Sequence, residues 1–388
     1  MPKTYKIVQI NTVADGPSPV AGVMNAITRH LSANNFDVST IAGYTVTGQT
    51  PPAALMQTHM QHRMAALAFR LSGKEPTAPT RRLTHRLDSL RPDLVVVHNT
   101  HGYYLDCGLL ARWCHDNRTP MVMIMHDHRL LTGRCAAPGQ CMAWADGDCD
   151  KCRHRSLYPA VWRRTAPIYP CRFLRQYDIT YVAVSQYLKD RAASVGIEAT
   201  VIHNGVDTDI FAPQPTAVKD FLMMAAANRW TANKNLEGVI NAFQSVRQPG
   251  DRLCIVGRGA KGHKSVTALG DSVTVIADSL TPRQMSELYN RSRLLVSAAH
   301  GEAFGMTVAE ALACGTPVLL NSGVGASSLI GSGGGMTADF DNRSQLHDAA
   351  LTALTMKPSA ETVTDTRRMA GQYAQLFRDI MNKNHQTK

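Results

Sequence analysis

The chain has 388 residues, of which 44% are hydrophobic and 18% are charged, and since a single core stops growing at about 250–300 residues we expect two domains. This composition excludes a disordered chain, and no apolar run reaches the roughly 18 residues needed to span a bilayer. The net charge of +11 favours anionic partners, but the basic residues are dispersed along the chain, so we expect no nucleic-acid partner.

Short apolar runs alternate with helical patterns along the chain, which is typical of βαβ units and parallel sheets. In the first half we expect strands at Lys6–Asn11, Asp37–Ile41, Leu94–His98, Met121–His126, Thr180–Ser185 and Thr200–His203, with helices near Val23–Ala33, Leu105–Asn117 and Gln186–Val195. In the second half we expect strands at Phe221–Ala226, Arg252–Val256, Val273–Ala277, Arg293–Ala298 and Pro317–Leu320. The fold class is therefore α/β, with two doubly wound, Rossmann-like domains that face a central cleft.

The domain boundaries follow from composition. A turn-rich stretch with two prolines, 205-GVDTDIFAPQPTA-217, separates the two series of strands. We therefore expect a first domain at 1–205, a linker at 206–217 and a second domain at 218–363. A final amphipathic helix at 364–388 is expected to pack back on the first domain.

The segment 301-GEAFGMTVAEALACGTPVLLNSG-323 follows an expected strand and contains a helix from about Phe304 to Cys314. The free N–H groups and positive dipole end at Phe304 and Gly305 attract a phosphate. Glu302 precedes this anion site and Glu310 lies within the helix, and a carboxylate accepts hydrogen bonds from a diol. This arrangement suits a nucleotide sugar.

Two basic residues, Arg229 and Lys234, follow the first strand of the second domain in 228-NRWTANKNLEGVI-240. They lie at the carboxyl end of that strand, where a doubly wound sheet binds its ligands. A guanidinium and an ammonium group there would neutralise a diphosphate. Either residue alone would be read as a solvated surface cation.

These motifs together resemble the retaining glycosyltransferases of the GT-B fold, often called family 4. The resemblance covers most of the chain, because 201-VIHNGVDTDIF-211, 182-VAVSQYLKDR-191 and 21-AGVMNAITRHL-31 also resemble motifs of that family. Glu302 and Glu310 match the family's paired glutamates.

The resemblance implies transfer of a sugar, with retention, from a UDP- or GDP-sugar to a glycan or lipid-linked saccharide in polysaccharide biosynthesis. The departing phosphate oxygen would take the acceptor's proton, so no metal or other cofactor is needed for catalysis. The resemblance assigns catalytic roles to His126, Glu302, Arg229 and Lys234, and donor contacts to Gly22, Arg229, Lys234, Ala303, Phe304, Gly305, Met306, Thr307 and Glu310. His126 would contact the donor sugar and Gly22 would approach the phosphates, although Ala21 stands where the family often has a first glycine.

Four cysteines cluster within a Cys-rich insertion at 133–155, namely Cys135, Cys141, Cys149 and Cys152. Their C-x5-C-x7-C-x2-C spacing predicts a structural zinc site, with reduced or redox-active thiols and an iron–sulfur cluster as alternatives. A similar insertion occurs in glycosyltransferases resembling those of colanic acid synthesis.

Three further hypotheses stay open. A nucleotide-sugar 2-epimerase has the same fold, and a zinc-containing nucleic-acid-binding or regulatory module would explain the charge and the cysteines but not the paired glutamates. The chain lacks a secretory leader pattern, which predicts a cytoplasmic protein. Basic helices around Arg63–Arg91 and Leu157–Arg175, together with Met64, Leu67, Leu157 and Trp162, predict peripheral association with an anionic leaflet on the cytoplasmic face of the inner membrane. The alternative is that these are solvated faces of ordinary helices.

Overall fold

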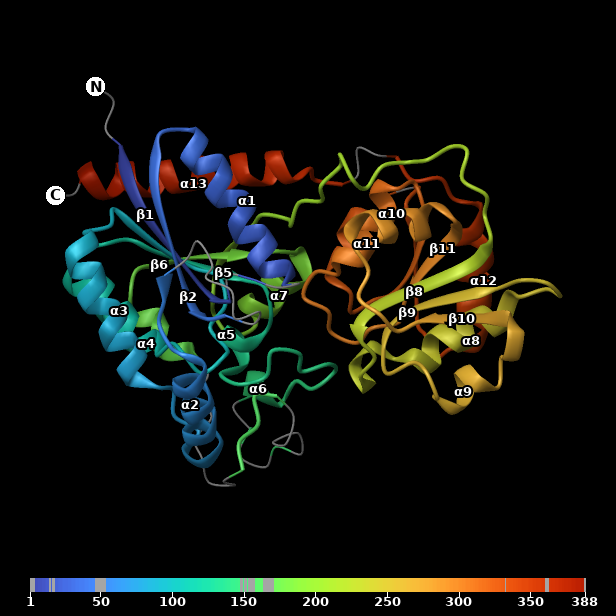
Figure 1. The fold of residues 1–388 in the computed structure, drawn as a ribbon, viewed down its shortest axis with the longest axis horizontal. Helices are drawn as coiled ribbons and strands as arrows, with labels where there is room; N and C mark the ends of the chain where they lie inside the picture. The colour runs from blue at the N-terminus through green and yellow to red at the C-terminus, as the bar shows by residue number, and fades with distance from the viewer. Residues whose placement is uncertain are drawn as a thin grey trace. The chain divides into compact units, whose positions relative to one another are not determined.

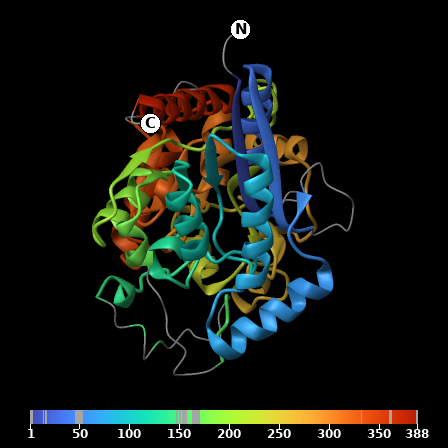
Figure 2. The same cartoon turned by 90° about the vertical axis from the view of Figure 1, so that its left-hand side faces the viewer.

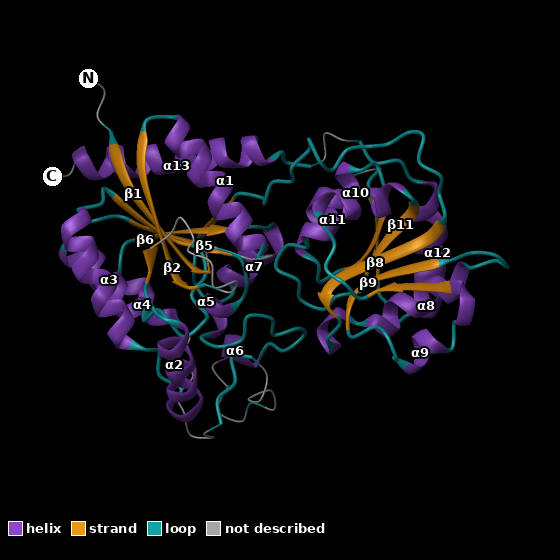
Figure 3. Ribbon diagram, in the orientation of Figure 1, coloured by secondary structure: helices purple, strands orange, loops and turns teal. Residues whose placement is uncertain are grey.

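A computed structural model describes residues 4–13, 15, 18–45, 54–146, 149, 152, 158–162, 171–331, 333–359 and 363–386. The chain divides into two compact units, the first formed by Met1–His203 with Arg367–Lys388 and the second by Asn204–Thr366 (Figure 1). Residues 206–217, expected as a linker, belong to the second unit. Each unit is a parallel sheet with helices on both faces (Figure 3).

The sheet of the first unit has seven strands among the described residues, in the order β3-β2-β1-β4-β5-β6-β7. They are β1 (Tyr5–Val13), β2 (Phe36–Tyr44), β3 (Ala54–Leu55), β4 (Leu94–Val97), β5 (Met121–Met125), β6 (Ile179–Ala183) and β7 (Ala199–Val201). All neighbouring pairs are parallel. β4 and β5 are buried at every residue, because helices cover both faces of a doubly wound sheet.

The helices of the first unit include α1 (Pro19–Ala33), α2 (His59–Ser72), α3 (Thr77–Leu90), α4 (Cys107–Asp116), α5 (Arg129–Thr132), α6 (Ala143–Asp146), η1 (Cys171–Gln176), α7 (Gln186–Ala193) and α13 (Thr366–Gln386). α1 begins earlier than expected, because the Ser18 side chain accepts from the Ala21 N–H and Pro19 stands at the first helical position. α13 buries Tyr373 and Phe377, and Asn382 accepts a hydrogen bond of 2.8 Å from Tyr5. Figures 1 and 2 show α13, in red, alongside β1, in dark blue.

The sheet of the second unit has six strands among the described residues, in the order β10-β9-β8-β11-β12-β13. They are β8 (Phe221–Arg229), β9 (Leu253–Arg258), β10 (Val273–Ile276), β11 (Ser292–Ser297), β12 (Val318–Asn321) and β13 (Gly335–Ala338). The helices include η2 (Ala232–Lys234), α8 (Leu236–Val246), α9 (Lys264–Thr267), η3 (Gly270–Ser272), α10 (Pro282–Asn290), α11 (Met306–Ala313), η4 (Gly325–Leu329) and α12 (Arg343–Thr355).

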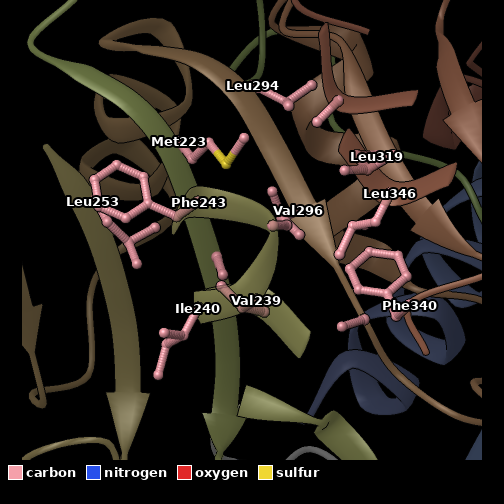
Figure 4. Close-up of a cluster of buried hydrophobic side chains, with 14 of the residues drawn as sticks. Met223, Val239, Ile240, Phe243, Leu253, Leu294, Val296, Leu319, Phe340 and Leu346 are labelled. Carbon is pink, nitrogen blue, oxygen red and sulfur yellow. The ribbon is translucent and has the colours of Figure 1, made fainter. Parts of the chain in front are cut away.

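One face of this second sheet packs on α8 and α12. Val239, Ile240 and Phe243 follow helical spacing on α8, and all three are buried. They lie against β8 and β11, where Met223 and Val296 point toward them (Figure 4). Burying one such side chain contributes about 1.5–3 kcal/mol, so this layer holds β8 and β11 in place.

Each sheet has a topological switch point, where the strand order reverses. In the second unit the chain leaves β8 for β9 on one side and returns to β11 on the other side. In the first unit β1 lies in the same way between β2 and β4. Open α/β sheets bind ligands outside the carboxyl ends of the strands at such points. A ligand site is therefore expected at the loops after β8 and β11 in the second unit, and at those after β1 and β4 in the first unit.

Candidate active site

The loops after β8 and β11 are joined at the switch point of the second unit. The His300 N–H donates to the Asn233 carbonyl oxygen at 2.8 Å. Beside this bond, Nζ of Lys234 forms an ion pair with Oε2 of Glu302. The structure therefore brings together two residues that were predicted separately, and no motif in the sequence predicts that they pair with each other.

Backbone hydrogen bonds fix the segment that leads into α11. The Glu302 N–H donates to the Gly323 carbonyl at 2.9 Å, and the Phe304 carbonyl accepts from the Ala326 N–H at 2.6 Å. Gly305 then caps the helix with a φ of 101°, which glycine adopts without the strain of a side chain. Phe304 is buried, whereas Ala303, Met306 and Thr307 are half-buried.

The helix α11 begins at Met306, two residues later than expected. The first N–H groups of a helix have no acceptor within the helix, so the amides of Met306 and Thr307 face outward with the positive end of the helix dipole. This is the geometry of an anion site. It lies next to the Lys234–Glu302 pair, because Glu302 is only four positions before Met306.

Glu310 lies one helical turn into α11, and one side chain among the described residues donates a hydrogen bond to it. The hydroxyl of Tyr289, a buried residue of α10, donates to its Oε2 at 2.8 Å. Burial raises the pKa of Glu310, and the hydrogen bond from Tyr289 opposes that rise. Helical spacing in α10 predicts that Tyr289 is buried, but no pattern in the sequence predicts its partner.

Arg229 is exposed at the carboxyl end of β8, in register with Arg258 at the end of β9. Arg258 donates to Oδ1 of Asn228 at 2.9 Å and was not predicted as a site residue. A Cβ atom at Gly257 would lie 1.7 Å from the Ala227 carbonyl oxygen, so only glycine allows the two strand ends to approach so closely. The glycine pair around Arg258 was the signal that could have identified this second basic residue.

In the first unit, His126 lies directly after β5 and contacts a buried histidine. Its Nε2 is 3.2 Å from Nδ1 of His98, whose Nε2 is 2.8 Å from Oε1 of Gln9. Burial lowers the pKa of His126 to about 4 and lowers that of His98 well below its usual range. Both rings are therefore neutral near pH 7. His98 and Gln9 were not predicted as site residues, although His98 follows the apolar run LVVV as His126 follows MVMIM.

A second polar cluster adjoins His126. Nε2 of His101 is 3.1 Å from Oδ2 of Asp127, and its Nδ1 is 3.0 Å from the hydroxyl of Tyr158. The amide of Arg129 donates to the other Asp127 oxygen at 2.7 Å. Burial raises the pKa of Asp127, but His101 and the Arg129 amide lower it by more, so the carboxylate stays ionised. Such a mixture of donors, acceptors and an exposed aromatic ring can bind a molecule rich in hydroxyl groups.

Gly22 lies within the first turns of α1 and not in a loop before it. Its N–H donates to the Ser18 carbonyl at 3.1 Å. It is exposed, and a Cβ atom there would have nothing within 4 Å. Its predicted contact with donor phosphates therefore cannot use its own amide while this helical bond is formed.

The structure does not support a metal site at the clustered cysteines. Cys135, Cys141, Cys149 and Cys152 are free thiols, and no three His, Cys, Asp or Glu side chains among the described residues could hold a metal ion. The buried guanidinium of Arg134 lies 3.7 Å from Sγ of Cys135 and 3.4 Å from Sγ of Cys152. The predicted structural zinc is therefore not supported. Residues 147–148, 150–151 and 153–155 of the insertion lie outside the described part.

Comparison with known proteins matches both units. The family model described as "Glycosyltransferase Family 4" matches residues 20–210, and the model described as "Glycosyl transferases group 1" matches residues 207–376. Within the described segments, no helix is long and apolar enough to cross a membrane.

Relatives and solved structures agree with these models. A putative colanic acid biosynthesis glycosyl transferase of Escherichia coli is 24% identical over 78% of this chain and 78% of its own length. A GDP-mannose-dependent alpha-(1-6)-phosphatidylinositol dimannoside mannosyltransferase of Mycobacterium tuberculosis is 24% identical over 75% of this chain and 71% of its own length. The crystal structure of Anabaena HepE in complex with UDP and glucose superposes with a TM-score of 0.64 at 16% identity, over 99% of this chain and 98% of that chain.

The two family models together run from residue 20 to residue 376, and they divide the chain near the boundary between the two compact units. The structural likeness extends over both Rossmann-like units. The chain belongs to the glycosyltransferases of the GT-B fold.

Proposed function

We propose that this glycosyltransferase moves a sugar, with retention of configuration, from a nucleoside diphosphate sugar to a glycan or lipid-linked saccharide in polysaccharide biosynthesis. The observation that supports this most is the meeting of Lys234, Glu302 and the amino end of α11 at the switch point of the second unit. The colanic acid relative supports the polysaccharide assignment. A UDP-sugar or a GDP-sugar is the proposed donor, because the HepE structure holds UDP and glucose and the mycobacterial relative is described as GDP-mannose-dependent.

The donor diphosphate is proposed to bind at the amides of Met306 and Thr307. Lys234 and the exposed Arg229 supply positive charge on the neighbouring loop. Glu310, about one turn further along α11, accepts hydrogen bonds from the ribose hydroxyls. Glu302 and the amides after it lie beside the sugar, and Glu302 holds Lys234 in position through their ion pair.

The chemical step requires stabilisation of negative charge that develops on the leaving diphosphate. Cations and amides that are already oriented do this without reorganisation, and such electrostatic stabilisation is commonly the largest catalytic contribution. In this proposal the leaving phosphate oxygen takes the proton of the acceptor hydroxyl, while Arg229, Lys234 and α11 hold the charge without a metal ion. His126 is proposed to contact the transferred sugar, and Gly22 remains a candidate for close approach to the donor.

The donor site is tested by a thermal-shift panel of nucleoside diphosphates and their sugars. A ligand that binds only the folded protein raises the melting temperature by mass action, so the matching base gives the largest shift. We expect the shift to be lost in Glu310→Ala and Lys234→Ala and kept in Val218→Ala, since Val218 is exposed elsewhere in the second unit. An unchanged shift in both site variants would refute the assignment. Isomerisation of free donor without an acceptor would identify an epimerase instead.

Peripheral membrane association is also proposed, through one face of α2. Met60, Met64, Leu67 and Leu71 recur at helical spacing on this helix, and all four are exposed, Met60 by 65% and Met64 by 66%. Trp162, 58% exposed, lies next to the helix, since its N–H donates to the Arg70 carbonyl at 2.7 Å. An apolar stripe of this kind lies in the interface of a bilayer when basic residues flank it.

The charge on this surface favours an anionic leaflet. Arg63 is exposed on α2 and the exposed Lys74 follows the helix, while α2 itself contains no Asp or Glu. Each basic residue near an anionic surface contributes about 1 kcal/mol. Leu157, predicted as part of the same surface, lies outside the described residues.

Vesicle sedimentation at low salt tests this surface. The chain is expected to pellet with vesicles of phosphatidylglycerol and phosphatidylethanolamine and not with phosphatidylcholine vesicles. Met64→Asp combined with Leu67→Asp should abolish pelleting, whereas Val218→Asp, a matched substitution at a residue 73% exposed in the second unit, should not. Equal pelleting of the double variant and the unmodified chain contradicts the proposal.

A further inference from the structure

A chain of polar side chains runs from α1 through the sheet to His126. The Thr28 hydroxyl is 2.9 Å from the Met24 carbonyl oxygen, and Nε2 of Gln9 is 2.7 Å from the Thr28 hydroxyl oxygen. Oε1 of Gln9 is 2.8 Å from Nε2 of His98, and Nδ1 of His98 is 3.2 Å from Nε2 of His126. Gln9 and His98 are buried, so no solvent competes for the hydrogen bond between them.

The hydrogen bonds in this series all run in one direction, which the Met24 carbonyl oxygen sets. A carbonyl oxygen only accepts, so the Thr28 hydroxyl donates to it and can then only accept from Gln9. The Gln9 amide nitrogen donates to Thr28, which turns the amide oxygen toward His98. That oxygen accepts from Nε2–H of His98.

The direction of these hydrogen bonds also determines which nitrogen of each imidazole ring carries the hydrogen. A neutral imidazole has one N–H and one acceptor nitrogen. Because His98 donates from Nε2, its Nδ1 accepts, and the hydrogen between the two rings therefore belongs to Nε2 of His126. Nδ1 of His126 is left as the acceptor, and none of the described residues forms a hydrogen bond with it.

We propose that Thr28, Gln9 and His98 are positioning residues that hold His126 with its hydrogen on Nε2 and present its Nδ1 lone pair to the substrate. The group that His126 recognises is then a hydrogen-bond donor, such as a sugar hydroxyl, and not a phosphate oxygen. This inference rests on the proposed function only in naming the ligand as a sugar. The assignment of the tautomer rests on the hydrogen bonds alone.

The surroundings of His98 and His126 favour the neutral form of both imidazole rings. Burial lowers the pKa of both histidines, and the neighbouring His126 lowers the pKa of His98 further. Asp127 opposes this at His126, but its carboxylate is already paired with His101 and the Arg129 amide. One hydrogen on each ring is therefore the expected state near neutral pH.

The test is nitrogen NMR of the full chain labelled with ¹⁵N-histidine, with His98→Asn and His126→Gln used to assign the two rings. We expect a protonated Nε2 and an unprotonated Nδ1 in both rings at neutral pH. Thr28→Ser keeps the hydroxyl and should leave the spectrum unchanged. Thr28→Val and Gln9→Leu remove the directing groups and should shift both rings toward a mixture of tautomers.

Two results would overturn the inference: a hydrogen on Nδ1 of His126 in the unmodified chain, or unchanged tautomers in both Thr28→Val and Gln9→Leu. The spectrum of the unmodified chain decides the first point even where a variant fails to fold. A second readout is the extra thermal shift given by UDP-glucose over UDP, or by GDP-mannose over GDP, which should fall in Gln9→Leu and persist in Thr28→Ser. Absence of any nucleotide shift would count against the proposed function and leave the NMR result standing.

Discussion

The hydrogen bond between Tyr289 and Glu310 yields a prediction that combines stability and pH. Tyr289→Phe removes the protein donor to the Glu310 carboxylate and leaves the buried ring in place. A hydrogen bond to a charged group contributes about 1.5–3 kcal/mol, and one to a neutral group about 0.5–1.5 kcal/mol. The variant should therefore lose about 1.5–3 kcal/mol of unfolding free energy at neutral pH and less in acid, where Glu310 is protonated.

The sign follows from the pKa of Glu310. Burial raises it above the ordinary value of 4.5 in the folded chain, so the folded state binds more protons than the unfolded state between 4.5 and the folded pKa. Unfolding free energy falls as pH rises through that interval. The hydrogen bond from Tyr289 lowers the pKa of Glu310. Removing the Tyr289 hydroxyl therefore extends this pH interval upward and enlarges the loss of unfolding free energy at neutral pH.

Urea denaturation at neutral and mildly acidic pH measures this loss. Tyr373→Phe is the matched control, because Tyr373 is equally buried and its hydroxyl has no hydrogen-bond partner among the described residues. The control should lose no stability at either pH. A Tyr289→Phe loss that is equal at both pH values, or a control that loses as much, would refute the reasoning.

Four further substitutions have defined outcomes. Phe243→Ala should cost about 3–5 kcal/mol in urea denaturation, because it empties a fully buried position between α8 and β8. Gly305→Ala should cost about 1–3 kcal/mol, because its φ of 101° strains any side chain and Val324 lies 3.2 Å from the added carbon, and it should weaken the nucleotide thermal shift. Gly22→Ala should fold as well as the unmodified chain or gain up to about 1 kcal/mol, because the added carbon meets nothing within 4 Å, and a weakened nucleotide shift would then locate the donor near it. Arg229→Ala should leave the melting temperature of the free chain unchanged and reduce the nucleotide shift, since its side chain is exposed.

The regular parts of the fold were predictable because burial leaves a strong periodic signal. Runs such as LVVV and MVMIM are fully buried strands in the structure. β3 and β13 were not predicted. β3 has two residues, and β13 begins at the last glycine of the run 331-GSGGG-335, which lacks the apolar pattern of a strand.

The site residues were predictable only where several of them lie close together in one short segment of the sequence. Glu302, Gly305 and Glu310 lie within ten residues, so one segment identified all three. Partners that are distant in sequence were missed. Tyr289 and Gln9 act through single hydrogen bonds to residues 21 and 89 positions away, and no local pattern records such a bond.

The zinc prediction shows the limit of spacing arguments. The four cysteines have metal-ligand spacing in the sequence, but the described thiols are free and Arg134 donates to two of the sulfurs. Ligand spacing in the sequence therefore does not establish a metal site by itself.

The central claim is that a nucleoside diphosphate sugar binds at the amino end of α11. A crystal structure of the chain soaked with UDP or GDP, whichever gives the larger thermal shift, tests it most directly. The account predicts diphosphate density at the amides of Met306 and Thr307, with Lys234 beside the phosphates and Glu310 on the ribose. Density for the nucleotide at any other place, with α11 bare, would contradict it.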